Sequence, residues 1–130
     1  MSTLIDTNIA IHLRDSDSWA VERYRTLAES PALSIVSIVE LEGGIVGRPD
    51  LAQARRASLD LLTARLEILD FDGRAASAYR DIIAIAGYSR SKLLDRMIAA
   101  TAIVHQRVLI TANGADFRDI PGLRLEIWAP

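Results

Sequence analysis

A chain of 130 residues, half of them hydrophobic, is long enough to bury a core, and we expect a single domain over residues 1–130. The absence of cysteine excludes disulfides, thiol nucleophiles and cysteine-bound zinc, and the net charge of −2 argues against a protein that coats nucleic acid non-specifically. Neither a signal peptide nor an apolar run of the ~20 residues that a membrane span needs is apparent, so we expect a cytoplasmic protein without a membrane partner.

Short apolar runs alternate with longer segments of helical spacing along the chain. The runs predict strands at residues 4–5, 33–36, 66–69, 108–110 and 125–127. Helices are predicted at about 7–13, 17–28, 51–66 and 72–87, after residue 36, and from Ser91 onward. This alternation predicts an α/β fold, a three-layer α/β/α arrangement with a central, mostly parallel sheet of about five strands.

Asp6 follows the first predicted strand directly, at the point where that strand gives way to a helix. Ligands and metals bind at the carboxyl ends of the strands in an open α/β sheet, so this position suits a functional acid. Asp is also among the best N-cap residues, and Asp6 could simply cap the helix at 7–13. Both interpretations stay open for this residue alone.

Glu40 lies near the start of the helix that follows the second predicted strand. The segment Ser37-Ile38-Val39-Glu40 matches a capping box, in which Ser37 is the N-cap and Glu40 bonds back to its backbone. The same position is compatible with function, because the first helical turn after residues 33–36 lies at the end of the sheet where Asp6 is expected.

Asp95 is harder to explain as a structural residue. A helix begun at Ser91 places it on the apolar stripe that faces the sheet, where a carboxylate is costly unless it is paired or bound to a cation. A favourable position in the first turn, or pairing with Arg90 or Arg96, is the alternative explanation. We also expect the basic residues around Asp95 to hold a nucleic-acid backbone, although a solvated helix start would look the same. These residues are Arg90, Lys92 and Arg96.

Asp116 follows the predicted strand at 108–110 after a turn that contains Asn113 and Gly114. A turn with an aspartate cap is an ordinary way to enter a short helix. Thr111 and Asn113, however, add a hydroxyl and an amide where partners for acidic ligands would be needed. The two interpretations carry similar weight.

Taken together, carboxylates that converge on one end of a sheet repel one another and need a divalent cation or a shared proton. Hard oxygen ligands select Mg²⁺ or Mn²⁺, and such a site serves hydrolysis of a phosphodiester by a metal-activated water. A phosphotransferase of the Asp-x-Asp type fits less well, because Asn8 replaces the second aspartate. A non-catalytic RNA- or protein-binding module on the same scaffold remains the alternative.

The ordered set of motifs resembles the PIN-domain family, and within it the VapC-type toxins of type II toxin–antitoxin systems. The resemblance spans nearly the whole chain and is carried by residues 4–8, 37–41, 95–102, 111–117 and 120–123, whereas residues 87–92 are more basic than the corresponding family segment. It implies a Mg²⁺- or Mn²⁺-dependent endoribonuclease that cleaves RNA, forms a homodimer and is blocked by a VapB-type antitoxin. It assigns the catalytic and metal-binding roles to Asp6, Glu40, Asp95 and Asp116, with Thr7, Asn8, Thr111 and Asn113 in support.

Overall fold

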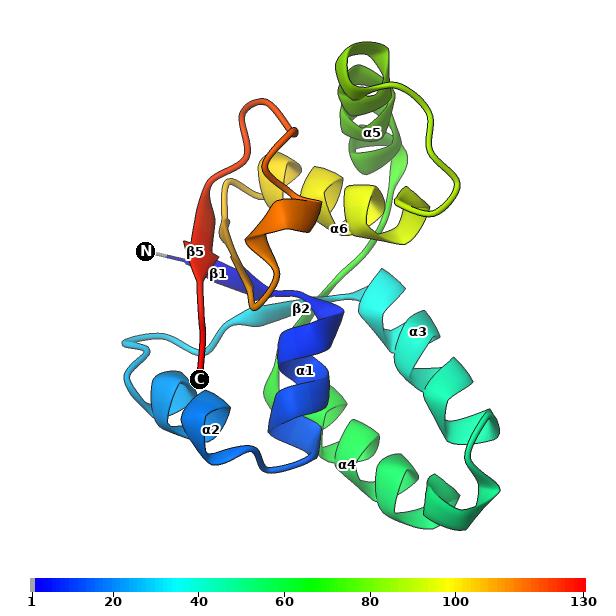
Figure 1. The fold of residues 1–130 in the computed structure, drawn as a ribbon, viewed down its shortest axis with the longest axis vertical. Helices are drawn as coiled ribbons and strands as arrows, with labels where there is room; N and C mark the ends of the chain where they lie inside the picture. The colour runs from blue at the N-terminus through cyan, green and yellow to red at the C-terminus, as the bar shows by residue number, and fades with distance from the viewer. Residues whose placement is uncertain (1) are drawn as a thin grey trace.

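A computed structural model describes residues 2–130 and contains one five-stranded sheet in the order β3-β2-β1-β4-β5, in which every neighbouring pair is parallel (Figure 1). The strands are β1 (Thr3–Ile5), β2 (Ala32–Ser34), β3 (Glu67–Leu69), β4 (Val108–Thr111) and β5 (Leu125–Ile127). The helices are α1 (Thr7–Arg14), α2 (Ser18–Arg25), α3 (Ile35–Val46), α4 (Ala52–Arg65), α5 (Gly73–Ala86) and α6 (Leu93–Val104), with short 3₁₀ helices η1 (Pro49–Leu51) and η2 (Gly114–Asp116).

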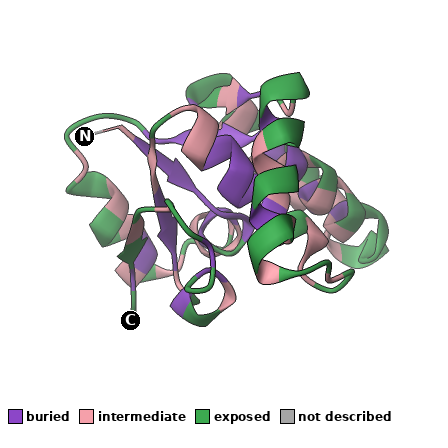
Figure 2. Ribbon diagram, turned by 90° about the horizontal axis from the view of Figure 1, so that it is seen from above, coloured by how far each residue is buried: buried purple, intermediate pink, exposed green. Residues whose placement is uncertain are grey.

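Two helical layers cover the two faces of the sheet. Successive strand residues point to opposite faces, so Leu4 joins a core cluster with α5 and α6, whereas Ile5 joins a second cluster with α1, α3 and α4. Figure 2 shows the central strands and the inner helix faces buried, with exposed residues on the outer surface. The predicted three-layer α/β/α fold with a parallel sheet of five strands is confirmed.

Helix α5 begins and ends where the sequence predicts. The Asp72 side chain accepts a hydrogen bond from the Ala75 backbone N–H at 3.1 Å, which satisfies one of the free donors of the first turn. Gly87 ends the helix with a φ of 84°, a left-handed conformation that glycine adopts at little cost.

The second strand and the helix after it differ from the prediction. Strand β2 ends at Ser34, whose hydroxyl accepts a hydrogen bond from the Val36 backbone N–H at 3.0 Å and so caps α3. The predicted capping box at Ser37 and Glu40 is therefore wrong, since the helix has begun by Ile35 and Glu40 lies beyond its first turn. The run of β-branched residues at 35–36 suggested a longer strand, but a serine cap started the helix earlier.

Helix α6 begins at Leu93, two residues after the predicted start at Ser91. The Leu93 backbone N–H bonds to the Arg90 carbonyl at 3.3 Å, so the preceding residues form a turn. Asp95 nevertheless lies in the first turn of the helix, as expected.

In the part of the chain that the structure describes, no helix is long and apolar enough to cross a membrane.

Replacing Ser34 with alanine should lower the free energy of unfolding by about 1 kcal/mol, because the N-cap of α3 is lost. The exposed Ser77 in α5 is the matched control, and its replacement with alanine should change stability by less than about 0.5 kcal/mol. Urea unfolding of both variants measures the difference. Equal effects of the two substitutions would contradict the assignment of Ser34 as the cap.

Candidate active site

The carboxyl end of the sheet brings together four acids that are far apart in the sequence. Asp6 lies between β1 and α1, Asp116 is in η2 beyond β4, and Glu40 and Asp95 lie on α3 and α6. Asp6 is buried and the other three are partly exposed. The charges of Asp6, Glu40 and Asp116 all raise the pKa of Asp95. We call this group the acidic cluster, which consists of Asp6, Glu40, Asp95 and Asp116.

Both carboxylate oxygens of Asp6 are held by hydrogen bonds. One accepts the Ile9 backbone N–H at 2.9 Å, so Asp6 does cap α1, and the other accepts the Thr111 hydroxyl at 2.5 Å. Because β1 and β4 are neighbours, Thr111 lies beside Asp6 at the end of the adjacent strand. The capping and the functional interpretations of Asp6 are thus compatible, since the cap fixes the direction of the carboxylate.

A chain of hydroxyls orients Glu40. The Thr7 hydroxyl donates to Glu40 Oε1 at 2.6 Å and lies 2.8 Å from the hydroxyl of Ser37, which is fully buried. The Thr7 hydroxyl has a single proton and lies within hydrogen-bond distance of both Glu40 Oε1 and the Ser37 hydroxyl oxygen, so it links these two residues. Ser37 therefore connects α3 to α1 and supports Glu40 through Thr7. The sequence did not predict this role, because its pattern indicated Ser37 as a helix cap.

Asp116 is held by the turn that leads into η2. The Asn113 side-chain amide donates to Asp116 Oδ2 at 2.8 Å, and the Asn113 backbone N–H donates to the Thr111 hydroxyl oxygen at 3.0 Å. Thr111 therefore lies between Asp6 and the turn of Asp116. The predicted supporting positions of Thr111 and Asn113 agree with these contacts, whereas Asn8 is exposed at the start of α1.

Burial and mutual repulsion raise the pKa of two members of the cluster. The pKa of Asp95 is raised to about 6, mainly by burial and then by the charges of Asp116, Glu40 and Asp6, while Lys92 opposes the shift. Burial also raises the pKa of Asp6, against the hydrogen bonds from Thr111 and Ile9. Among residues 2–130, no ion pair neutralises a member of the acidic cluster.

The three basic residues near Asp95 differ in what their side chains can reach. Arg90 is exposed, and Lys92 is partly exposed with its Nζ 3.7 Å from Asp119 Oδ2. Arg96 is buried and donates to the Gly87 carbonyl and to Asp119, so it is not presented to a substrate and does not pair with Asp95. The predicted substrate contact of Arg96 is corrected accordingly. Asp119 carried no signal in the sequence that distinguished it from other surface acids.

The donors of the acidic cluster fit a hard divalent cation, because all are carboxylate oxygens without a protein cation bonded to them. Within residues 2–130, no three acidic or imidazole side chains are already placed to hold one common ion. The carboxylates are close enough for their charges to interact, but they are not arranged around one common position in this structure.

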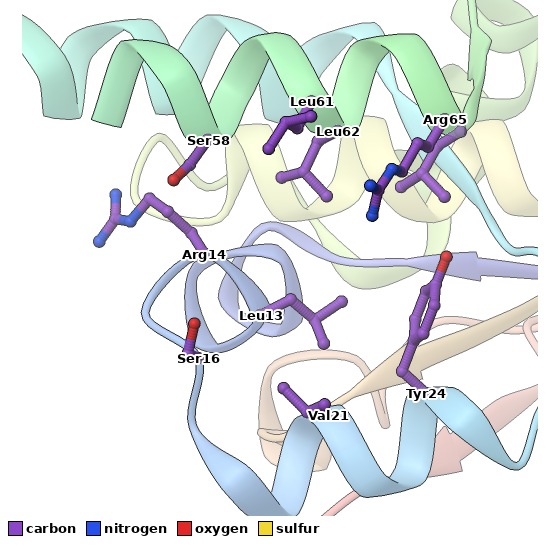
Figure 3. Close-up of a pocket in the computed structure, with 10 residues that line it drawn as sticks. Leu13, Arg14, Ser16, Val21, Tyr24, Ser58, Leu61, Leu62 and Arg65 are labelled. Atoms are coloured by element: carbon purple, nitrogen blue, oxygen red, sulfur yellow. The ribbon is translucent and has the colours of Figure 1, made fainter. Parts of the chain in front are cut away.

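A separate cavity lies between α1, α2 and α4, as Figure 3 shows. It has a volume of about 320 Å³, and its lining includes Leu13, Tyr24, Leu62 and Arg65. Leu13 is at the end of α1, whereas Asp6 caps its start, and eight helical residues separate the two ends by roughly 12 Å. The cavity is therefore distinct from the acidic cluster.

Stability of the metal-free protein should depend on the titration of Asp95. A pKa raised in the folded state gives stabilisation that is fully present below the unfolded value of 3.8 and is lost as the pH rises through about 6. We expect the wild-type protein to lose stability relative to Asp95→Asn between about pH 4 and pH 7. Urea unfolding in EDTA across this range measures the difference, and parallel pH profiles would contradict the raised pKa.

The PIN domain family model matches residues 3–123 of the chain. Ribonuclease VapC2 of Rickettsia felis is 31% identical over 98% of each chain, and the tRNA(fMet)-specific endonuclease VapC of Salmonella typhimurium is 30% identical over 96% of each. The crystal structure of Rickettsia felis VapBC2 bound to a promoter DNA fragment matches with a TM-score of 0.85 and 26% identity, covering 99% of this chain and 100% of that one. The crystal structure of DNA-bound VapBC from Salmonella typhimurium matches with a TM-score of 0.82 and 28% identity, and it also covers 99% of this chain and 100% of that one. The chain therefore belongs to the PIN-domain family.

Proposed function

We propose that the chain is a Mg²⁺- or Mn²⁺-dependent endoribonuclease, and that it is the toxin of a toxin–antitoxin pair. The observation that carries this proposal is the acidic cluster, in which repelling carboxylates converge without a protein cation to neutralise them. A divalent cation relieves that repulsion and, when bound, acts as a Lewis acid that activates water and offsets charge on the phosphodiester. The names of the VapC relatives support ribonuclease activity.

The residues of the cluster have distinct parts in this proposal. The principal ligands are Asp6, which Thr111 and the Ile9 N–H hold in one direction, and Asp95 on α6, whose charge interacts with that of Asp6. Glu40 completes the set from α3, and Asp116 contributes from η2. Hydrolysis joins the water oxygen to phosphorus and breaks the bond between phosphorus and one ribose oxygen, which leaves with a proton.

The basic residues beside the site and the names of the relatives support the proposed substrate and partners. Arg90 is exposed and Lys92 is partly exposed beside the start of α6, where cationic side chains can hold the RNA backbone. One relative is named a tRNA(fMet)-specific endonuclease, so initiator transfer RNA is the first substrate to test. A VapB-type antitoxin, a homodimer and action in the cytoplasm complete the proposal, and the structural neighbours from Rickettsia felis and Salmonella typhimurium are VapBC proteins.

Replacing Asp6 or Asp95 with asparagine should lower the rate of metal-dependent RNA cleavage by at least about 100-fold, because each substitution removes an anionic ligand. Asp81 is exposed on α5, and Asp81→Asn is the matched control that should cleave like the wild type. The assay uses total RNA and initiator transfer RNA with antitoxin-free protein, with and without EDTA. Retained cleavage in a folded Asp6 variant, or cleavage that EDTA does not affect, would refute the mechanism.

Removing the Ser37 hydroxyl should weaken Mn²⁺ binding by about tenfold, because Thr7 then loses the partner that directs it towards Glu40. The variant is Ser37→Ala, and isothermal titration with Mn²⁺ measures its affinity. Ser34→Ala is the control, because it removes a nearby buried hydroxyl that caps α3 without contacting Thr7. Equal Mn²⁺ affinities of the two variants would show that the Ser37 hydroxyl does not orient Glu40.

A further inference from the structure

Arg96 follows Asp95 directly on α6, yet its side chain is turned into the protein. Only 3% of that side chain is exposed. One guanidinium nitrogen donates to the Gly87 carbonyl, and another lies 3.4 Å from Asp119 Oδ2. Its Nε is buried without a hydrogen-bond partner in the region that the structure describes.

This burial is not explained by stability alone. A guanidinium loses its hydration when it is buried, and replacing a buried ion pair by apolar side chains is often neutral or stabilising. The unpartnered Nε adds to the cost of the arrangement. What Arg96 does provide is a rigid connection among three segments, because it reaches the end of α5 and the segment after η2 from the first turn of α6.

Asp119 connects Arg96 to the turn that carries Asp116, three residues earlier. Lys92 Nζ lies 3.7 Å from the same Asp119 oxygen, so two cations from the start of α6 hold this carboxylate. Phe117 and Ile120 flank it in sequence and are buried in the core cluster that includes α6. Charge and packing thus hold the segment after η2 against α6.

This connection opposes a repulsion between the same two segments. Asp95 on α6 and Asp116 on η2 repel each other, and Asp116 is the strongest charge acting on Asp95. Attraction between Arg96 and Asp119 draws α6 and the end of η2 together. The Arg96 guanidinium is buried, which reduces the screening of this attraction by solvent, whereas the Asp119 side chain is 43% exposed.

We propose that Arg96 is a positioning residue that sets the separation of Asp95 and Asp116 through Asp119 and Gly87, and thereby the affinity of the acidic cluster for a divalent cation. The proposal rests on the metal-dependent nuclease function above. Arg96 itself contacts neither the cation nor the substrate.

Two variants and a matched control test this role. Arg96→Met removes the guanidinium and keeps much of the side-chain volume, and Asp119→Asn removes the charge of its partner. Arg107→Met is the control, because Arg107 is also mostly buried and holds the Thr3 carbonyl at 3.1 Å and Glu67 at 2.9 Å. Arg107 precedes β4 and so lies at the amino end of the sheet, opposite the acidic cluster.

The measurements are isothermal titration with Mn²⁺ and, on the metal-free proteins, hydrogen exchange resolved by segment. Arg96→Met and Asp119→Asn should each weaken Mn²⁺ binding by about tenfold or more and speed exchange in residues 113–120. The double variant should weaken binding by less than the product of the two single effects, because both substitutions break the contact between Arg96 and Asp119. Arg107→Met should leave both the Mn²⁺ affinity and the exchange of that segment unchanged.

Mn²⁺ affinities in both test variants that match those of the wild type or of Arg107→Met would overturn the proposal. If Arg96→Met does not fold, Asp119→Asn decides the question, since the Asp119 side chain is 43% exposed and its replacement leaves the core intact. If the wild-type protein binds no Mn²⁺, the proposed function fails instead. The exchange comparison then still decides whether Arg96 positions Asp116, and unchanged exchange in residues 113–120 would refute it.

Discussion

Repulsion among the carboxylates of the acidic cluster is the constraint on which the arrangement at this end of the sheet depends. Burial adds to the cost of these charges, because it raises the pKa of Asp95 to about 6 and also raises the pKa of Asp6. The surrounding hydrogen bonds act against it by fixing individual carboxylates, with Thr111 on Asp6 and Thr7 on Glu40. In the proposed function, the charge that destabilises the metal-free protein is also the charge that would hold a divalent cation.

The parallel sheet makes this convergence possible. Every strand runs in the same direction, so the residues that follow β1, β2 and β4 lie at one end of the sheet although they are spread over about 100 positions of the sequence. Each acid comes from a different element, and hydrogen bonds set the direction of Asp6, Glu40 and Asp116. The separation between elements depends on connections outside the acidic cluster, such as the contact of the buried Arg96 with Asp119.

The sequence allowed the fold and the members of the cluster to be predicted, because strand periodicity and strand-end acids are local patterns. Asp6 and Asp72 as caps, Gly87 as a helix end and Asp95 in a first helical turn all follow from neighbouring residues. Side-chain direction could not be predicted in the same way. The sequence pattern indicated Ser37 as the cap of this helix, whereas in the structure Ser34 is the cap and Ser37 lies against Thr7 of α1. The burial of Arg96 likewise depends on Asp119, a partner 23 residues away.

The proposed function depends on the binding of a divalent cation by the acidic cluster. Crystals of the antitoxin-free protein soaked in Mn²⁺, with data collected for anomalous scattering, test it most directly. We expect an anomalous peak among the carboxylates of Asp6, Glu40 and Asp95, with Glu40 still bonded to Thr7, and no such peak in crystals of Asp6→Asn. A peak elsewhere, or none in crystals of the folded wild-type protein, would contradict it.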